Sequence, residues 1–466
     1  MKHKSLLLAS ASILCLASCG GGGGDNTPKE LSLAFLSDNP TSITVGEKVK
    51  IGVDLKNGDV SKLSYKIDDP LIGSVDNEGN VTALRSGVLS LTVTPSEDEE
   101  KAIQTYLDIK NPTGIKVEFT QKTTTLAVGG SYQFAAKVTG DASNSGVGFL
   151  LNNYALGDLT EDGKLTIKQK GVDEAVTVTA YSLANSDATA DCKVTITGEQ
   201  PTTGIEQING YSLIFLDDFR GTRLNETNWQ YMNGDGSQYG VASGWGNQEQ
   251  EFYRKENIKL IDGNMIITAK KADSQKNKGM PFTSGRIRSY RRVAYTYGRI
   301  EARISCPFGN GIWPAFWMLP ESEGTSAYGG WPNSGEIDIM EAKGRVKYST
   351  DGTIHFATKN GDHTYQFGTY VMPNGQDISQ FHDYAVEWDE GEIRWYVDNN
   401  LYHTCNADTK TWSIKNGTGE FPAPFDKKFH ILFNMAVGGN YDGFKMPGDN
   451  EVPAQMKVAH VKWYQK

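Results

Sequence analysis

Two acidic residues near the middle of the chain alternate with two apolar ones. Glu336 and Asp338 are separated by Ile337, and Ile339 follows. Because successive side chains of a β-strand point to opposite faces, a strand here places both acids on one face and both isoleucines on the other. This pattern predicts a strand with one face packed in a core and an acidic face turned to a cleft.

A third acid, Glu341, joins this group only if the strand is irregular. It lies five positions after Glu336 and would face the core in a regular strand. One extra residue near Ile339 and Met340, a β-bulge, would return Glu341 to the face of Glu336. Three carboxylates on one face repel each other, so a purely structural strand has little reason to collect them. The segment therefore predicts a functional site.

Paired carboxyl groups can cleave a glycosidic bond. Two of them about 5 Å apart suit a retaining glycosidase, in which one attacks the anomeric carbon and the other protonates the leaving oxygen. The third can orient the nucleophile and shift its pKa. Calcium binding is the alternative, because oxygen clusters also bind calcium. Calcium ligands usually come from loops, so a strand favours the glycosidase.

The elements that must position these acids are strands. All nine tryptophans lie at or beyond Trp229, and short apolar stretches bounded by Gly, Asn, Asp or Pro continue to the end. No helical period persists over several turns. We therefore predict an all-β fold, with residues 208–466 as one large domain of two curved antiparallel sheets.

An internal repeat precedes this domain. Gly73 and Gly79 correspond to Gly157 and Gly163 at an offset of 84 residues, and similar alternating runs surround both pairs. A repeat of this length is one small domain, and short strands between Asn/Asp/Gly turns are typical of β-sandwiches. Both copies resemble bacterial immunoglobulin-like domains, which implies domains at 30–111 and 112–200. We interpret them as spacers, and glycan binding is the alternative.

Charge and the N-terminal segment bear on partners and location. The 466 residues carry a formal net charge of −10, which disfavours nucleic acid and favours a neutral polymer. Residues 1–18 read as a signal peptide with a basic start and a short apolar run. The Leu-Ala-Ser-Cys sequence ending at Cys19 resembles a bacterial lipobox, which implies acylation of Cys19. Residues 19–29 would form a Gly-rich tether to the outer membrane, with the enzyme facing the cell surface or the periplasm.

The segment from Gly335 to Glu341 resembles the bulged catalytic motif of glycoside hydrolase family 16. Other motifs resemble its laminarinase branch: Gly244 to Asn247 with Glu249 and Tyr253, Ser284 to Ile287, Gly311 to Pro320, and Asn434 to Gly439. The resemblance implies a β-jelly-roll sandwich with Glu336 as nucleophile, Asp338 as its helper and Glu341 as general acid/base. It also implies endo-hydrolysis of β-1,3-glucan (laminarin) and of mixed-linkage β-1,3/1,4-glucan by a monomer that needs no cofactor.

Aromatic and amide side chains would bind the glucan. Flat indoles stack on pyranose rings, and the resemblance places Trp313, Trp317 and Trp331 near the central subsites, with Trp245 and Trp412 as further candidates. Core packing is the alternative for each of them. Asn247, Arg286 and Asn434 match positions that hydrogen-bond hydroxyl groups, and His355 matches a position beyond the scissile bond. A structural salt bridge is the alternative for Arg286, and a core position is the alternative for His355.

One departure from the family pattern and two alternative functions stay open. Ala459 stands where many relatives carry an aspartate that helps to hold a structural calcium, so we expect no calcium site of that kind. One rival is a marine galactan hydrolase of the agarase or porphyranase type. The other is a non-catalytic lipoprotein that captures glycan in the same cleft.

Overall fold

The computed structural model describes residues 30–121, 123–141, 145–321, 328–358, 360–406, 412 and 421–466. Within these ranges the elements are β-strands and short 3-10 helices, which confirms the predicted all-β class. The 3-10 helices are η1 (Val60–Lys62), η2 (Glu99–Lys101), η3 (Ser237–Tyr239), η4 (Lys255–Asn257) and η5 (Ser274–Asn277). None of the helices in these ranges has the length and apolar character needed to cross a membrane.

The first N-terminal unit packs a four-stranded sheet, β2-β9-β8-β5, and a three-stranded sheet, β3-β7-β6, around one apolar core, with β1 and β4 paired beside them. Its strands are β1 (Ser32–Phe35), β2 (Ser42–Thr44), β3 (Lys48–Lys50), β4 (Val53–Lys56), β5 (Leu63–Ile67), β6 (Gly73–Val75), β7 (Asn80–Ala83), β8 (Gly87–Pro95) and β9 (Ile103–Lys110).

The second N-terminal unit repeats this topology strand for strand. Its sheets are ordered β11-β18-β17-β14 and β12-β16-β15, with β10 and β13 paired beside them, so the sequence repeat is a repeat of topology. Its strands are β10 (Lys116–Phe119), β11 (Thr123–Ala127), β12 (Ser131–Gln133), β13 (Ala136–Thr139), β14 (Val147–Leu151), β15 (Gly157–Leu159), β16 (Lys164–Ile167), β17 (Ala175–Ser182) and β18 (Thr189–Thr197).

The C-terminal unit is a sandwich of two large sheets. The eight-stranded sheet runs β21-β26-β36-β29-β30-β31-β32, with β27 also paired to β36. Its strands are β21 (Gln230–Tyr231), β26 (Arg286–Arg288), β27 (Ala294–Tyr295), β29 (Ile312–Pro320), β30 (Glu336–Glu341), β31 (Ser349–Ala357), β32 (His363–Val371) and β36 (Phe429–Val437).

The eleven-stranded sheet lies across the core from it and runs β22-β25-β24-β37-β28-β33-β34-β35, with β19, β20 and β23 at its side. Its strands are β19 (Gln207–Ile208), β20 (Tyr211–Asp217), β22 (Glu251–Tyr253), β23 (Ile258–Ile261), β24 (Asn264–Lys271), β25 (Phe282–Ser284), β28 (Gly298–Ser305), β33 (His382–Asp389), β34 (Glu392–Val397), β35 (Asn400–Asn406) and β37 (Ala454–Gln465).

The core between these two sheets explains why apolar and polar residues alternate along the strands. Ile337 and Phe433 of the smaller sheet and Val386 and Trp388 of the larger one belong to a single buried cluster and are fully inaccessible to solvent. Because each strand gives one face to this core, its other face is free to carry polar and aromatic side chains. On the eight-stranded sheet, that free face carries the acidic residues.

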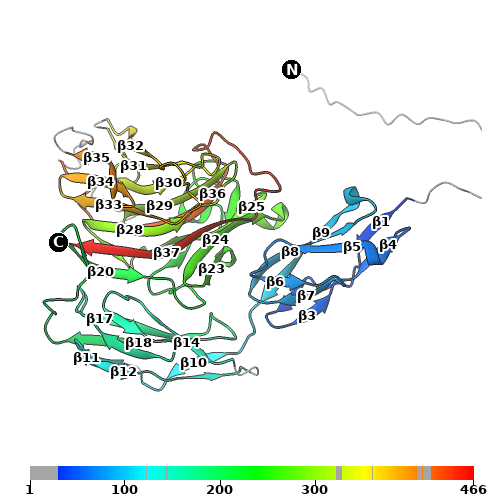
Figure 1. Cartoon of the computed structure of the whole chain (residues 1–466), viewed down its shortest axis with the longest axis horizontal. Helices are drawn as coiled ribbons and strands as arrows, with labels where there is room; N and C mark the ends of the chain where they lie inside the picture. The colour runs from blue at the N-terminus through cyan, green and yellow to red at the C-terminus, as the bar shows by residue number, and fades with distance from the viewer. Residues whose placement is uncertain are drawn as a thin grey trace, which may run out of the picture.

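Both N-terminal units contact the C-terminal unit. In Figure 1 the first unit lies beside β23 and β24, and the second lies below β20. The Lys270 ammonium of β24 is buried, lies 3.2 Å from an oxygen of Asp68 and donates to the Val88 carbonyl at 2.6 Å. Because this ammonium and its two acceptors belong to different units, the contact fixes how the first unit packs against β24.

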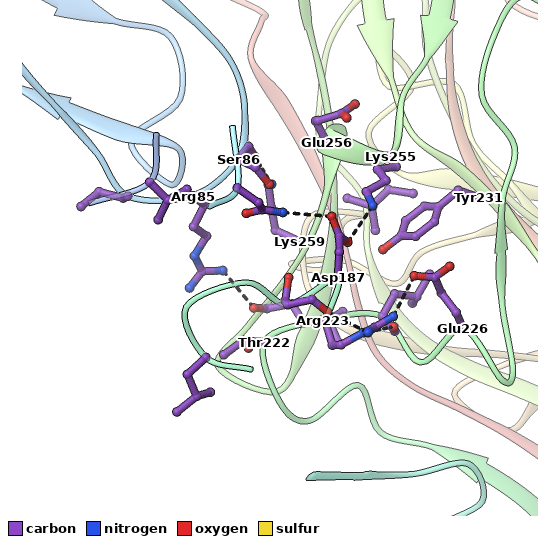
Figure 2. A pocket seen from close by; sticks show the side chains of 18 of the residues that line it. Arg85, Ser86, Asp187, Thr222, Arg223, Glu226, Tyr231, Lys255, Glu256 and Lys259 are labelled. Atoms are coloured by element: carbon purple, nitrogen blue, oxygen red, sulfur yellow. Dashed lines mark hydrogen bonds and ion pairs between the residues drawn. The ribbon is translucent and has the colours of Figure 1, made fainter. Parts of the chain in front are cut away.

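A cavity of about 360 Å³ lies where the three units meet (Figure 2). Asp187 of the second unit accepts from Lys255 of the C-terminal unit at 2.7 Å and from Asn111, which follows the first unit, at 2.9 Å. Arg223 donates to the Ser186 carbonyl at 2.7 Å across the same junction. These contacts hold both N-terminal units against the C-terminal sandwich.

Candidate active site

The predicted bulge is present in β30. Met340 pairs with Phe316 of β29, but the next pair along β29 is Trp317 with Asp338, so Ile339 is the extra residue. The register to β31 also shifts between Asp338 and Glu341. One inserted residue thus lets Ile339 and Met340 both enter the core while the acids before and after them share the opposite face.

Each acid has its own polar partner on this face. The indole of Trp331 donates to Glu336 Oε2 at 3.0 Å, and the indole of Trp313 donates to Glu341 Oε1 at 2.9 Å. The remaining acid, Asp338, places Oδ2 3.1 Å from His355 Nε2. The glutamates therefore keep one oxygen each outside these contacts, and Asp338 is held between its neighbours.

Burial determines the charge of this group. It raises the pKa of Glu336 to about 8, and the neighbouring Asp338 carboxylate adds to the effect. Burial also raises the pKa of Asp338, and it raises that of Glu341, with the Asp338 charge as the second cause. Since buried neighbouring carboxyls release their protons one at a time, the group keeps a proton near neutral pH. One protonated and one ionised carboxyl side by side is the state that acid-assisted glycoside cleavage needs.

A cleft of about 360 Å³ opens over the acids. This volume lies within the size range of ligand sites. The structure brings most of the predicted site residues to its walls: Trp245, Asn247, Arg286, Trp313, Trp317, Trp331, Glu336, Asp338, Glu341 and Asn434.

Aromatic stacking holds the Arg286 side chain at one end of this cleft. Its guanidinium lies 4.2 Å from the centre of the Trp245 ring and 4.8 Å from that of Trp317. Among the described residues no carboxylate forms a salt bridge with Arg286, and its Nε approaches Met232 Sδ at 3.4 Å. The guanidinium therefore has donors available for ligand hydroxyl groups, and the salt-bridge alternative has no partner in the described structure.

A chain of hydrogen bonds behind the cleft fixes its amide side chains. Trp317 donates to Asn434 Oδ1 at 2.7 Å, and Asn434 donates to the Tyr253 hydroxyl at 3.1 Å. That hydroxyl donates to Glu249 Oε2 at 3.0 Å, and Asn247 donates to the other Glu249 oxygen at 3.0 Å. The buried Glu249 carboxylate thus orients both predicted amides.

Several members of the site are not predicted from the sequence. Glu249 and Tyr253 are predicted only as parts of a motif, although a carboxylate next to a Trp-Gly-Asn turn is a signal for a hydrogen-bonding role. The ring of Tyr441 stacks on Trp313 at 4.8 Å, and His363 shares a 2.8 Å hydrogen bond with His355. The spacing of these residues in the sequence predicts neither contact, because each contact joins segments that only the folded sheet brings together.

Trp412 does not reach the cleft, so its interpretation as a sugar-stacking residue needs correction. Its side chain is 2% exposed and packs in the main core, stacked on Phe421 at 4.9 Å and edge-on to Phe425 at 5.3 Å. A large indole gains more from full burial than from a half-exposed position when a core pocket is available. Cys19, the predicted lipidation site, lies outside the described residues.

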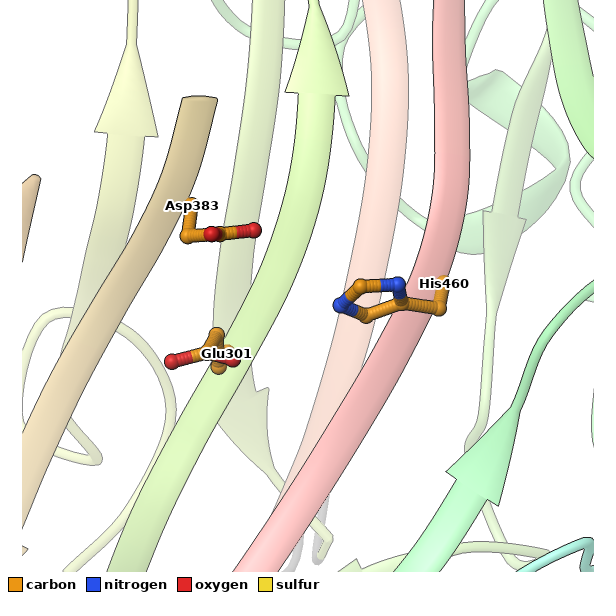
Figure 3. A group of neighbouring side chains, drawn as sticks. All are labelled: Glu301, Asp383 and His460. Carbon is orange, nitrogen blue, oxygen red and sulfur yellow. The ribbon is translucent and has the colours of Figure 1, made fainter. Parts of the chain in front are cut away.

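A second polar cluster lies on the eleven-stranded sheet, away from the cleft. Glu301, Asp383 and His460 come from the adjacent strands β28, β33 and β37, and their ligand atoms lie within 4.8 Å of one another (Figure 3). Arg299 donates to Glu301 at 2.5 Å, and Arg303 pairs with Asp383 at 3.1 Å. Since arginines already neutralise both carboxylates, the cluster is an ion-pair network rather than a cation site. Ala459, which precedes His460, offers no side-chain ligand.

Comparisons with known proteins agree with this geometry. The family model "Glycosyl hydrolases family 16" matches residues 226–441. The chain is 36% identical over 270 residues to a β-glucanase of Rhodothermus marinus, which covers 54% of this chain and 85% of that protein. It is 35% identical over 234 residues to a glucan endo-1,3-β-glucosidase of Cryptopygus antarcticus, covering 49% and 80%.

A longer relative shares the same segment. The chain is 37% identical over 267 residues to glucan endo-1,3-β-glucosidase A1 of Niallia circulans, which covers 56% of this chain and 38% of that protein. The chain thus matches well under half the length of this relative.

The indole bond to Glu336 predicts a measurable shift. This bond lowers the Glu336 pKa against the effect of burial, so Trp331→Phe should raise that pKa further above its value of about 8. Infrared titration of the carboxyl bands, with Glu336→Gln to assign the band, measures it. Trp313→Phe is the matched control, because its indole bonds Glu341 instead. An equal Glu336 pKa in wild type and Trp331→Phe would contradict the assignment.

Proposed function

Because the chain belongs to glycoside hydrolase family 16, we propose that it is an endo-acting, retaining β-glucanase. Its substrate is β-1,3-glucan of the laminarin type, and mixed-linkage β-1,3/1,4-glucan is a second substrate. The observation that carries the proposal is the bulged strand β30, which directs the buried Asp338 and the half-buried Glu336 and Glu341 into a cleft walled by indoles. The names of the similar glucanases support the choice of glucan.

The reaction proceeds by double displacement. Glu336 attacks the anomeric carbon while Glu341 gives its proton to the leaving glycosidic oxygen, which forms a glycosyl-enzyme ester. Glu341 then removes a proton from water, and that water attacks the anomeric carbon, breaks its bond to the Glu336 oxygen and releases the carboxylate. The order of proton transfers requires Glu341 to start protonated and Glu336 to start ionised. Because burial raises the pKa of Glu336 to about 8, the ionised form of Glu336 becomes more populated as the pH rises towards that value.

The surrounding side chains favour this division of roles. Glu336 lies in hydrogen-bond contact with Asp338, and this contact lowers the pKa of the aspartate. Asp338 Oδ2 is also 3.1 Å from His355, so the helper is oriented from both sides. The Trp331 indole lowers the pKa of Glu336 and so favours the ionised form that attacks. Burial and the Asp338 charge raise the pKa of Glu341 and so favour the protonated form that the acid needs. Asp338 thus orients the nucleophile, and the two carboxyl groups share a proton.

Hydrolysis of polysaccharides tests the proposed function. Wild-type protein should release oligosaccharides from laminarin, curdlan and barley β-glucan but not from agarose. Glu336→Gln should release none, because the amide cannot attack. Glu341→Gln should cleave these glucans about 10²–10⁴-fold more slowly and retain more activity on aryl glycosides, whose leaving groups need no proton.

Three results would redirect this proposal. Products only from agarose would keep the chemistry but replace the substrate by a galactan. Laminarin binding without products from any polymer would indicate a glycan-binding protein. A Glu336→Gln variant as active as wild type would contradict the role of Glu336.

We also propose that the protein is a lipoprotein of the outer membrane. The Leu-Ala-Ser-Cys sequence before the Gly-rich tether supports acylation of Cys19, and Gly20 after it is not the acidic residue associated with inner-membrane retention. Wild-type protein should enter the detergent phase in a Triton X-114 partition of bacterial cells, and Cys19→Ala should stay in the aqueous phase. Equal partition of both would overturn the anchor.

A further inference from the structure

The edge strand of the eight-stranded sheet carries exposed aromatic rings. β32 is the last strand in the sheet order, and Tyr365 and Phe367 on it are 53% and 55% exposed. Exposed neighbouring aromatic side chains on one sheet face are unusual, because burial would remove their apolar area from water. We therefore expect these two exposed rings to have a function.

The register places both rings on the same face as the acids. Glu336 pairs with His355 of β31, and His355 pairs with Tyr365 of β32. Residues directly opposite each other in an antiparallel sheet point to the same side. Asp338 leads in the same way through Thr353 to Phe367. Tyr365 and Phe367 thus stand two strands from the acids, which is about 10 Å across the sheet.

A continuous series of ring contacts joins the cleft to this edge. The Trp331 ring, whose indole bonds Glu336, lies 4.6 Å from the His363 ring, and His363 lies 6.0 Å from Tyr365. His355 stacks on His363 at 5.1 Å, and Tyr365 lies 6.0 Å from Phe367. Flat rings therefore extend from the nucleophile to the edge of the sheet.

The far side of the acids is already walled by Trp245, Trp317 and Arg286. The acids thus lie between an enclosed half, where these side chains form walls, and an open half, where the rings of β32 form a floor. A polymer cut internally must cross both halves of such a surface. Aromatic faces match the apolar faces of neutral pyranose rings and carry no charge to select an ionic ligand.

We propose that Tyr365 and Phe367 form a sugar-stacking platform that binds a neutral β-glucan chain beyond the catalytic carboxyl groups, opposite the Trp245 side. This inference rests on the proposed function and adds to it. The platform makes the protein prefer long chains, because a short oligosaccharide fills the enclosed half without reaching β32. The competing occupant is a second copy of this chain, since an open edge strand can pair with another edge.

Variants of the full chain test the platform. Tyr365→Ala/Phe367→Ala removes both rings, and Tyr365→Trp/Phe367→Trp keeps flat rings at the same positions. Tyr348→Ala is the matched control, because Tyr348 is 58% exposed and precedes β31 outside the series of ring contacts. Circular dichroism and thermal melts of all variants establish that they are folded.

Two readouts separate the platform from catalysis. In a Glu336→Gln background, the double alanine variant should bind laminarin about tenfold more weakly by affinity electrophoresis, as expected for the loss of about 1.4 kcal/mol of stacking. In the active background, its ratio of kcat/KM on laminarin to kcat/KM on laminaritriose should fall about tenfold. The tryptophan variant should restore both values, and Tyr348→Ala should match wild type.

The outcomes distinguish this inference from the proposed function. Ring-dependent laminarin binding without hydrolysis by wild type would support the platform and overturn the enzyme. Hydrolysis with equal binding and equal ratios in the double alanine and Tyr348 variants would overturn the platform and keep the enzyme. Absence of laminarin binding in the Glu336→Gln background would overturn the platform. A dimer that sedimentation detects in wild type and not in the double alanine variant, with laminarin binding unchanged, would assign the rings to self-association instead.

Discussion

Everything at this site depends on one extra residue in strand β30. With Ile339 inserted, Ile337, Ile339 and Met340 all face the core, and the acid that follows them returns to the face of the acid that precedes them. Without the insertion, Glu341 would point into a fully buried apolar cluster, where an ionisable group without a partner is very costly. The bulge therefore couples the packing of the sandwich to the placement of the acids, and neither can change alone.

Collecting three carboxyl groups in a buried place has an electrostatic cost, which the surrounding residues partly offset. Indoles donate to Glu336 and Glu341, and His355 lies against Asp338. These contacts do not remove the repulsion, and burial still holds all three pKa values above normal. This incomplete compensation is useful, because full compensation would leave all three carboxyl groups ionised near neutral pH, with no proton for the leaving group. The same tryptophans that moderate the charge also wall the cleft, so recognition and chemistry share their side chains.

Much of this arrangement follows from local sequence. The alternation around Ile337 predicts the faces of β30, and the position of Glu341 predicts the bulge, because both depend on the period of a strand. The roles of the three acids stay predictions that rest on family resemblance. Local sequence does not predict which tryptophans reach the cleft: Trp313 and Trp412 are both candidates, yet Trp313 lines the cleft and Trp412 lies in the core. Tyr365 lies ten residues after His355 along the chain. The two residues are neighbours because β31 and β32 pair, which the local sequence does not predict. The contact of Lys270 with Asp68 cannot be predicted from the sequence either, because it joins two units whose sequences share no pattern.

We propose that Glu336 attacks the sugar, and the roles of the other two acids depend on this step. The most direct test is to trap the glycosyl-enzyme with a 2-deoxy-2-fluoro β-laminaribiosyl fluoride, which forms the ester quickly and releases it slowly, and to locate the label by peptide mass spectrometry. We predict one label per chain, on Glu336, and its slow loss when laminaribiose is added as acceptor. A label on Glu341 or elsewhere, or turnover of the reagent with inversion and no label, would contradict the account.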